Sequence, residues 1–148
     1  MRTAIVYHSS HHGCTKKLLD AIARDREVDL IDASSPAPAG LEGYELIGFA
    51  SGIYYGKFHQ SVLDFARERL PRGKRVFFLC TYGGKADTRA IASSVREREA
   101  VVLGEFGCKG FDTFGPFRLV GGINKGRPNG ADLEDARRFF ARMCEEAG

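Results

Sequence analysis

The sequence predicts a doubly wound α/β domain, in which helices cover both faces of a parallel β-sheet. Five short segments with strand character alternate along the chain with segments whose apolar residues have helical spacing. Right-handed crossovers between successive parallel strands give the expected strand order 2-1-3-4-5. The 148 residues contain no internal repeat and no linker, so we expect one domain over residues 1–148.

The first half of the chain supplies three of the five strands. Ala4–Tyr7 is an apolar run typical of a strand buried on both faces, and a helix is expected from about Thr15 to Asp25. Val28–Asp32 alternates in polarity, as a strand at or near a sheet edge does. A loop with two prolines, Ala33–Gly43, separates it from the third strand, Tyr44–Ala50.

The second half continues the alternation and closes with a helix. Arg75–Cys80 has the strongest strand character in the chain and is expected at the centre of the sheet, and Ala100–Phe106 is the fifth strand. The helices are expected from about His59 to Leu70, from about Asp87 to Glu97 and from about Ala131 to Glu146.

A connection of 24 residues, Gly107–Gly130, precedes the last helix and contains seven glycines and three phenylalanines. A loop of this length in a compact domain is either functional or contains small elements of its own. Three interpretations of Phe111, Phe114 and Phe117 stay open: they cap a ligand site, meet a partner, or fill a secondary core.

Composition excludes several classes of protein. With 43% hydrophobic and 28% charged residues, the chain is typical of a globular protein, and no apolar run approaches the roughly 20 residues that span a bilayer. We therefore expect no membrane insertion and, without a signal peptide, a cytoplasmic location. The four cysteines show no CxxC pair and are expected to be reduced. A formal charge of +3 is too weak and dispersed to indicate a nucleic-acid partner.

The chain is organised around the polar loop Ser9–Thr15, between the first strand and the first helix. Backbone N–H groups and the positive end of the helix converge there, which suits a phosphate or another small anion. Ser9, Ser10 and Thr15 add hydroxyl groups, and Gly13 lets the backbone approach closely. The sequence predicts an anion site in this loop.

Other phosphate-binding loops do not fit this stretch. Neither GxxxxGK[ST] nor GxGxxG occurs, which excludes a Walker loop and argues against a dinucleotide site. A thiol phosphatase needs an arginine at the far end of a loop that begins at Cys14, but Asp20 stands there. A receiver domain needs an acidic residue at the end of the first strand, and none lies between Met1 and Lys17.

Two further loops follow parallel strands and should meet the first one at the carboxyl edge of the sheet. Each contains a tyrosine beside glycine. Phosphate donors next to such tyrosines favour a phosphorylated, planar aromatic ligand. The loop residues are Ser51, Gly52, Ile53, Tyr54, Tyr55, Gly56 and Lys57 in the one, and Thr81, Tyr82, Gly83 and Gly84 in the other.

Over essentially its whole length the chain resembles the short-chain flavodoxins. The stretch Ser10-His11-His12-Gly13-Cys14-Thr15 is similar to their phosphate loop, Ser/Thr-x-Thr-Gly-Asn-Thr, with histidines in place of two threonines and cysteine in place of asparagine. A His-His-Gly loop and the run Phe111–Phe117 resemble a subgroup of flavodoxin-like proteins. The resemblance implies a three-layer flavodoxin-like sandwich that binds FMN, with its phosphate held by Ser10, His12, Cys14 and Thr15.

The resemblance also implies roles for the other two loops. Tyr54 or Tyr55 is expected to pack against the isoalloxazine ring, with Tyr82 as the second stacking residue, and the Gly56 peptide to hydrogen-bond flavin N5. Flavodoxins are acidic around this site, whereas here Lys57 follows Gly56. A cation at roughly 6 Å favours the anionic reduced flavin by about 2–3 kcal/mol before solvent screening. We therefore expect a less negative potential for the second electron.

Some residues of the first loop allow other interpretations. His8, His11, His12 and Cys14 could form a metal site, although adjacent histidines rarely converge on one ion, and we expect no metal. His11 or His12 contacts the phosphate or is simply exposed to solvent. Cys14, near a helix N-terminus, is either a redox-active thiol or a small spectator.

Three functions follow from these patterns. The first is an FMN-binding, flavodoxin-like electron carrier between redox partner proteins, which needs no catalytic acid or base. The second is an FMN-dependent reductase or oxidase of a small substrate such as a quinone, favoured by the non-acidic character and the long aromatic loop. The third is a binding module of the same fold without flavin. Enzyme activity and oligomeric state stay open.

Overall fold

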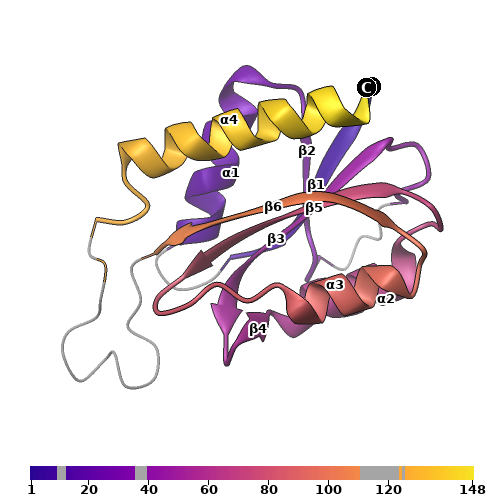
Figure 1. Ribbon diagram of the computed structural model, residues 1–148, viewed down its shortest axis with the longest axis horizontal. Helices are drawn as coiled ribbons and strands as arrows, with labels where there is room; N and C mark the ends of the chain where they lie inside the picture. The colour runs from indigo at the N-terminus through magenta and orange to yellow at the C-terminus, as the bar shows by residue number, and fades with distance from the viewer. Residues whose placement is uncertain (10–12, 36–39, 111–123, 125) are drawn as a thin grey trace.

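The computed structural model describes residues 1–9, 13–35, 40–110, 124 and 126–148, which form a three-layer α/β sandwich (Figure 1). Helices α1 and α4 cover one face of the sheet, and α2 and α3 cover the other. The strands are β1 (Thr3–His8), β2 (Asp29–Asp32), β3 (Leu46–Tyr54), β4 (Lys57–Phe58), β5 (Arg75–Tyr82) and β6 (Val101–Lys109). The helices are α1 (Cys14–Asp25), α2 (Gln60–Arg69), α3 (Arg89–Arg96) and α4 (Gly130–Ala147).

The five parallel strands lie in the order β2-β1-β3-β5-β6, which confirms the predicted doubly wound sheet. β2 lies at an edge, as its alternating pattern predicts, and the buried β5 lies between β3 and β6. The register pairs His8 with Ser51 and Gly52 with Thr81, so the carboxyl ends of three strands are neighbours.

The prediction of five strands was incomplete, because β4 pairs antiparallel with β3. Tyr54 pairs with Lys57, and the two residues between them, Tyr55 and Gly56, have positive φ angles of 51° and 79°. That is the geometry of a tight two-residue hairpin turn. A strand of two residues has no polarity pattern by which a sequence could reveal it. The predicted loop Ser51–Lys57 is therefore the end of β3 followed by a hairpin.

Other element ends also differ from the sequence-based expectations. β5 continues to Tyr82 and β6 to Lys109, so the first residues of the long connection belong to a strand. Several predicted features lie outside the described residues: the histidines His11 and His12 with Ser10, and the phenylalanine run Phe111–Phe117.

Two apolar clusters hold the layers together, one on each face of the sheet. In the α1/α4 layer, Phe77 of β5 is fully buried and packs edge-on against Phe139 and Phe140, with ring centroids 6.0 and 5.8 Å away. Its partner in the register of β3 is Gly48, over which the Phe77 ring lies. Within the described part of the chain, no helix has the length and apolar character needed to cross a membrane.

Candidate functional site

The N-terminus of α1 meets the ends of β1 and β3 at the carboxyl edge of the sheet (Figure 1). Gly13 precedes the helix with a φ of 66°, and a Cβ placed on it would meet no atom within 4 Å. The first turn of α1 contains no acidic residue that would compete for its N–H groups. The positive end of the helix dipole therefore lies beside Gly13 without a carboxylate of the first turn to offset it, which suits an anion.

Ser9 holds this loop in place rather than simply offering a donor. Its Oγ accepts a hydrogen bond from the backbone N–H of Lys16 at 3.2 Å, and Lys17 N–H donates to the Gly13 carbonyl at 3.0 Å. Two N–H groups near the start of α1 are thus satisfied within the protein. The N–H groups of the residues at the tip of the helix are the ones that a ligand would meet.

Three of the predicted site residues have hydroxyl side chains that lie beneath the site and connect its loops. The hydroxyls of Thr15 and Thr81, both buried, are 2.9 Å apart and form one hydrogen bond between α1 and the end of β5. The fully buried Ser51 donates to the Gly52 carbonyl at 2.6 Å and accepts from His59 N–H at 2.9 Å. These side chains fix the distances between the loops that would surround a ligand.

Tyr54 lies in an aromatic cluster that sequence reasoning missed. The rings of His8, at the end of β1, and His59, before α2, are stacked with centroids 3.6 Å apart and planes 9° from parallel. Tyr54 contacts both edge-on, at 5.9 Å from His8 and 5.2 Å from His59. The cluster supports the hairpin from the side of α2.

Tyr55 and Gly56 form the exposed tip of the hairpin. The Tyr55 side chain is 88% exposed, and a Cβ on Gly56 would meet no atom within 4 Å. The two tyrosines therefore differ in environment, and which of them faces a ligand stays a prediction. Lys57 is exposed beside them, with Nζ 3.3 Å from Gln60 Oε1.

The loop after β5 is held against the far end of β6. Tyr82 is half-buried, and its ring lies against Gly107 of β6. Asn124, with a φ of 57°, donates from its side-chain amide to the Gly83 carbonyl at 2.8 Å. This contact ties the long connection to the predicted second stacking loop.

The start of α4 closes the site from the other side. Asn129 caps the helix in a reciprocal capping box with Asp132, whose carboxylate also accepts two hydrogen bonds from Arg127, at 2.6 and 2.8 Å. These bonds, from Arg127 first, lower the pKa of Asp132. Cys14 Sγ lies 3.7 Å from the Arg127 carbonyl as a weak donor, so the first residue of α1 is fixed to this cap.

Neither deeply buried thiol suits redox chemistry at neutral pH. Burial raises the pKa of both Cys80 and Cys108 to about 12. All four cysteines are described and none forms a disulfide. Within the described ranges, no group of three His, Cys, Asp or Glu side chains could hold a metal ion, and His11 and His12 of the suspected metal cluster lie outside these ranges.

Comparison with known proteins identifies the family to which this fold belongs. The family model of the flavodoxin domain matches residues 5–107. An uncharacterised protein of Methanocaldococcus jannaschii is 36% identical over 143 residues, which cover 94% of this chain and 95% of that protein. This chain belongs to the flavodoxin family.

Solved flavodoxins share the fold over nearly the whole length. A flavodoxin from the domain Archaea superposes with a TM-score of 0.73 at 22% identity, and flavodoxin 2 from Bacillus cereus with 0.72 at 18%, each covering 99% of both chains. The flavodoxin of Fusobacterium nucleatum bound to flavin mononucleotide superposes with 0.68 at 13% identity, again over 99% of both chains. The flavodoxin-like fold predicted from the sequence is confirmed.

The features that sequence reasoning missed depend on contacts between distant segments. His8 and His59 stack only because the fold brings the end of β1 beside the residue before α2. Neither histidine lies in a sequence pattern that would predict this contact. Asn124 lies among glycines, as turn residues do, but its partner Gly83 is 41 residues away.

The stacked histidines predict that stability falls in mild acid. Burial lowers the pKa of His8, with a further contribution from His59 that Asp32 partly offsets, and burial lowers the pKa of His59. The unfolded chain takes up protons below about pH 6.5 while the folded pair stays neutral, so the free energy of unfolding decreases as the pH falls below that value. Urea denaturation at several pH values measures this slope.

His59→Asn is the matched variant for that measurement. Nδ1 of His59 accepts a hydrogen bond from Ser61 N–H, and asparagine is a good N-cap that does not titrate. The loss of stability between about pH 7.5 and pH 5.5 should be smaller in the variant than in the wild type. Equal slopes in the two proteins would show that the pair does not govern the acid sensitivity.

Proposed function

We propose that this protein binds FMN and carries electrons between redox partner proteins. The observation that carries the proposal is the N-terminus of α1 at Gly13, with no acidic residue in its first turn, at the same edge of the sheet as a hairpin whose tip exposes Tyr55. A phosphate group and a planar aromatic ring are the two parts of FMN. A member of the same fold with bound flavin mononucleotide supports the choice of ligand.

The residues present fit such a ligand. The start of α1, from Gly13 to Thr15, would hold the phosphate, with Thr15 acting from below through its bond to Thr81. Tyr55 or Tyr54 would cover one face of the ring and Tyr82 would lie at the other side. The backbone of Gly56, with a positive φ and open space around it, would present its peptide to flavin N5.

Bound FMN supplies the ability to accept and release one or two electrons, so the protein needs only to hold and expose it. The chain provides the anion site, the aromatic cover and an exposed hairpin tip. We also propose a cytoplasmic location, which is supported by four cysteines outside any disulfide.

An assay separates the electron carrier from a reductase of small substrates. The FMN-loaded protein is reduced with dithionite without oxygen and then mixed with an excess of ferricyanide. A carrier is reoxidised stoichiometrically, yet it does not turn over when given NADH or NADPH with a quinone. Turnover at about 1 s⁻¹ or faster would instead assign it as an FMN-dependent reductase. A protein that retains no FMN would contradict both functions.

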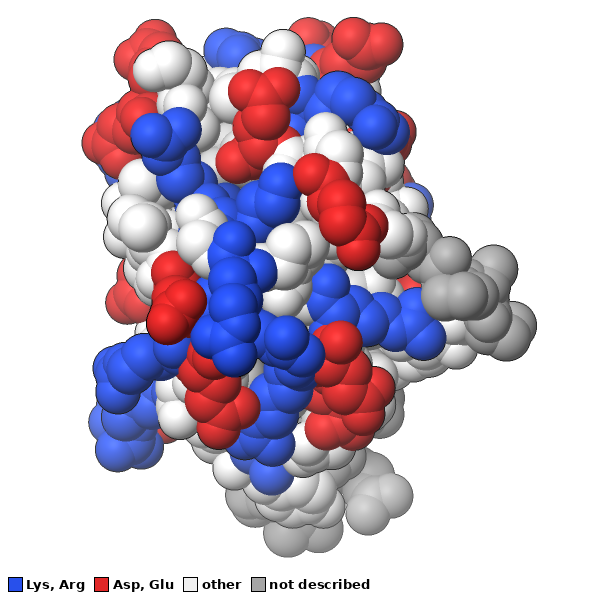
Figure 2. All heavy atoms as spheres, turned by 90° about the vertical axis from the view of Figure 1, so that its right-hand side faces the viewer, with Lys and Arg blue, Asp and Glu red and all other residues white. Residues whose placement is uncertain are grey.

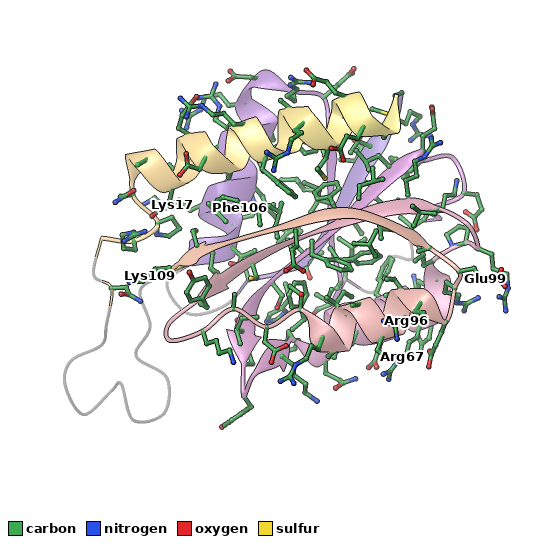
Figure 3. All side chains as sticks on the ribbon, in the orientation of Figure 1. Lys17, Arg67, Arg96, Glu99, Phe106 and Lys109 are labelled. Carbon is green, nitrogen blue, oxygen red and sulfur yellow. The ribbon has the colours of Figure 1, made fainter. Side chains whose placement is uncertain are left out.

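Lys57 is expected to raise the potential of the second reduction step. It follows the turn at Gly56 and is exposed, and it would stabilise negative charge on a ring bound beside the hairpin. Lys57→Glu should make this potential more negative by about 40–60 mV in low salt, as measured by anaerobic potentiometry. Arg96→Glu, with the same charge change at the opposite end of the molecule, should leave it nearly unchanged (Figure 3). Equal potentials for wild type and Lys57→Glu would refute this role.

A further inference from the structure

Positive charge is concentrated at the end of the molecule that contains the candidate flavin site. The described loops and helix starts that follow β1, β3, β5 and β6 (residues 8–9, 13–17, 52–60, 82–89, 107–110, 124 and 126–132) carry seven cationic and two anionic side chains, a net charge of +5. The other described residues carry thirteen cationic and sixteen anionic side chains, a net charge of −3. We call the seven cations the basic rim: Lys16, Lys17, Lys57, Lys85, Arg89, Lys109 and Arg127.

The two carboxylates among these residues are already neutralised. Asp87 accepts two hydrogen bonds from Arg89, at 3.1 and 2.8 Å, which lower the pKa of Asp87 to about 2. Asp132 is held in the same way by Arg127. Arg89 and Arg127 are thus each paired with a carboxylate. The uncompensated positive charge of the basic rim therefore comes from its lysines.

The lysines of the rim are only partly compensated. Lys16 pairs with Asp20, one turn further along α1. Lys17, Lys57, Lys85 and Lys109 are exposed and form no ion pair with any described residue. Two nearby acids lie just outside the rim, Asp32 at the end of β2 and Glu105 within β6, and they reduce but do not cancel its charge.

The helices add to the same potential. α1, α2 and α3 all begin at this end of the sheet, and none of them has an acidic residue in its first turn. The dipole ends of α1 and α2 are therefore not offset by a carboxylate of the first turn, whereas at α3 the Asp87 carboxylate accepts a hydrogen bond from Arg89 N–H at 3.0 Å. Figure 3 shows Lys17 and Lys109 together at this end, whereas Arg67, Arg96 and Glu99 lie at the other.

The opposite end of the molecule is not a second basic surface. In Figure 2, which faces the amino ends of the strands, a band of blue side chains crosses the surface with red side chains on both sides of it. Ion pairs join Arg67 to Glu97 and Arg72 to Glu99, at 3.7 and 3.5 Å, so these two arginines are neutralised in place.

We propose that the basic rim is the docking surface for an acidic redox protein. The proposal rests on the proposed function, because an electron carrier must meet its partner at the end where the flavin lies. Opposite charges steer such encounters and raise the association rate, whereas like charges suppress the wrong partner. A partner with a basic face would be repelled by the exposed lysines. An acidic iron–sulfur protein has the complementary charge.

The test measures binding of two probes, a strongly acidic [2Fe–2S] ferredoxin and a strongly basic c-type cytochrome, by calorimetry on the FMN-loaded protein. The ferredoxin should bind more tightly, and its affinity should fall at least tenfold between about 20 mM and 300 mM salt. Lys85→Glu with Lys109→Glu should weaken ferredoxin binding about tenfold or more in low salt. Neither lysine is among the residues predicted to hold FMN.

Arg69→Glu with Arg96→Glu is the matched control, with the same change of charge at the other end, and should alter ferredoxin affinity less than about twofold. Equal weakening by both double variants, tighter binding of the cytochrome, or no ferredoxin binding at all would overturn the proposal. Each titration is repeated without FMN. If the protein binds ferredoxin at the rim but does not retain FMN, the proposed function fails while the docking surface stands.

Discussion

Replacing Gly48 with alanine is expected to lower the free energy of unfolding by about 3 kcal/mol. A Cβ at this position would lie 2.4 Å from Cζ and 2.6 Å from Cε2 of the Phe77 ring, far inside van der Waals contact. Phe77 is fully buried between Phe139 and Phe140, so its ring has little room to move aside. Urea denaturation at neutral pH measures the loss.

A double-mutant cycle shows whether the ring is the cause. Phe77→Leu removes the distal ring atoms that the new methyl group would meet, so Gly48→Ala should cost much less in that background than in the wild type. Gly130→Ala is the control, because a Cβ at this first residue of α4 would meet nothing within 4 Å, and it should be neutral or slightly stabilising. Additive effects of the two core changes would contradict the packing argument.

Cys14→Asp is expected to weaken FMN binding more than a hundredfold while leaving the fold intact. Cys14 is the first residue of α1, and a carboxylate there repels a phosphate about 5 Å away by about 3 kcal/mol at an effective dielectric near 20. The same carboxylate interacts favourably with the helix dipole, so thermal stability should not fall on that account. Fluorescence titration with FMN measures the affinity.

Two comparisons isolate the charge effect. Cys14→Ser keeps a small neutral side chain that can still donate to the Arg127 carbonyl, and it should bind FMN within a few-fold of the wild type. Riboflavin, which has no phosphate, should bind the Asp variant and the wild type equally. FMN affinity that is unchanged in Cys14→Asp would place the phosphate elsewhere.

The sheet could be predicted because buried parallel strands and amphipathic helices carry strong patterns. Arg75–Cys80 is apolar enough to be recognised as an interior strand, although β3 and not β5 is the central one, and the alternation of Val28–Asp32 marks an edge strand. The missed strand β4 has two residues, and its existence depends on the positive φ angles of Tyr55 and Gly56. Such a turn is set by local backbone geometry, which hydrophobic periodicity does not report.

The candidate site could be predicted in outline but not in its internal contacts. The three loops were correctly expected to follow neighbouring strands, since connection order alone places them. The sequence did not reveal that Thr15 and Thr81 bond to one another, or that Ser51 is fully buried. Those roles depend on the register of the strands, which is fixed only in the folded sheet. Contacts of Ser10, His11 and His12 stay predictions, because these residues lie outside the described part.

We propose that the start of α1 and the hairpin tip together form an FMN site, and this is tested by a fluorescence titration of the purified apoprotein with FMN and with riboflavin. We expect quenching of FMN fluorescence with a Kd below about 1 μM, and much weaker binding of riboflavin. Quenching of FMN would show that aromatic side chains pack against the ring. Weaker binding of riboflavin, which has no phosphate, would show that the protein binds the phosphate group. Absence of FMN quenching, or equal affinity for both flavins, would contradict it.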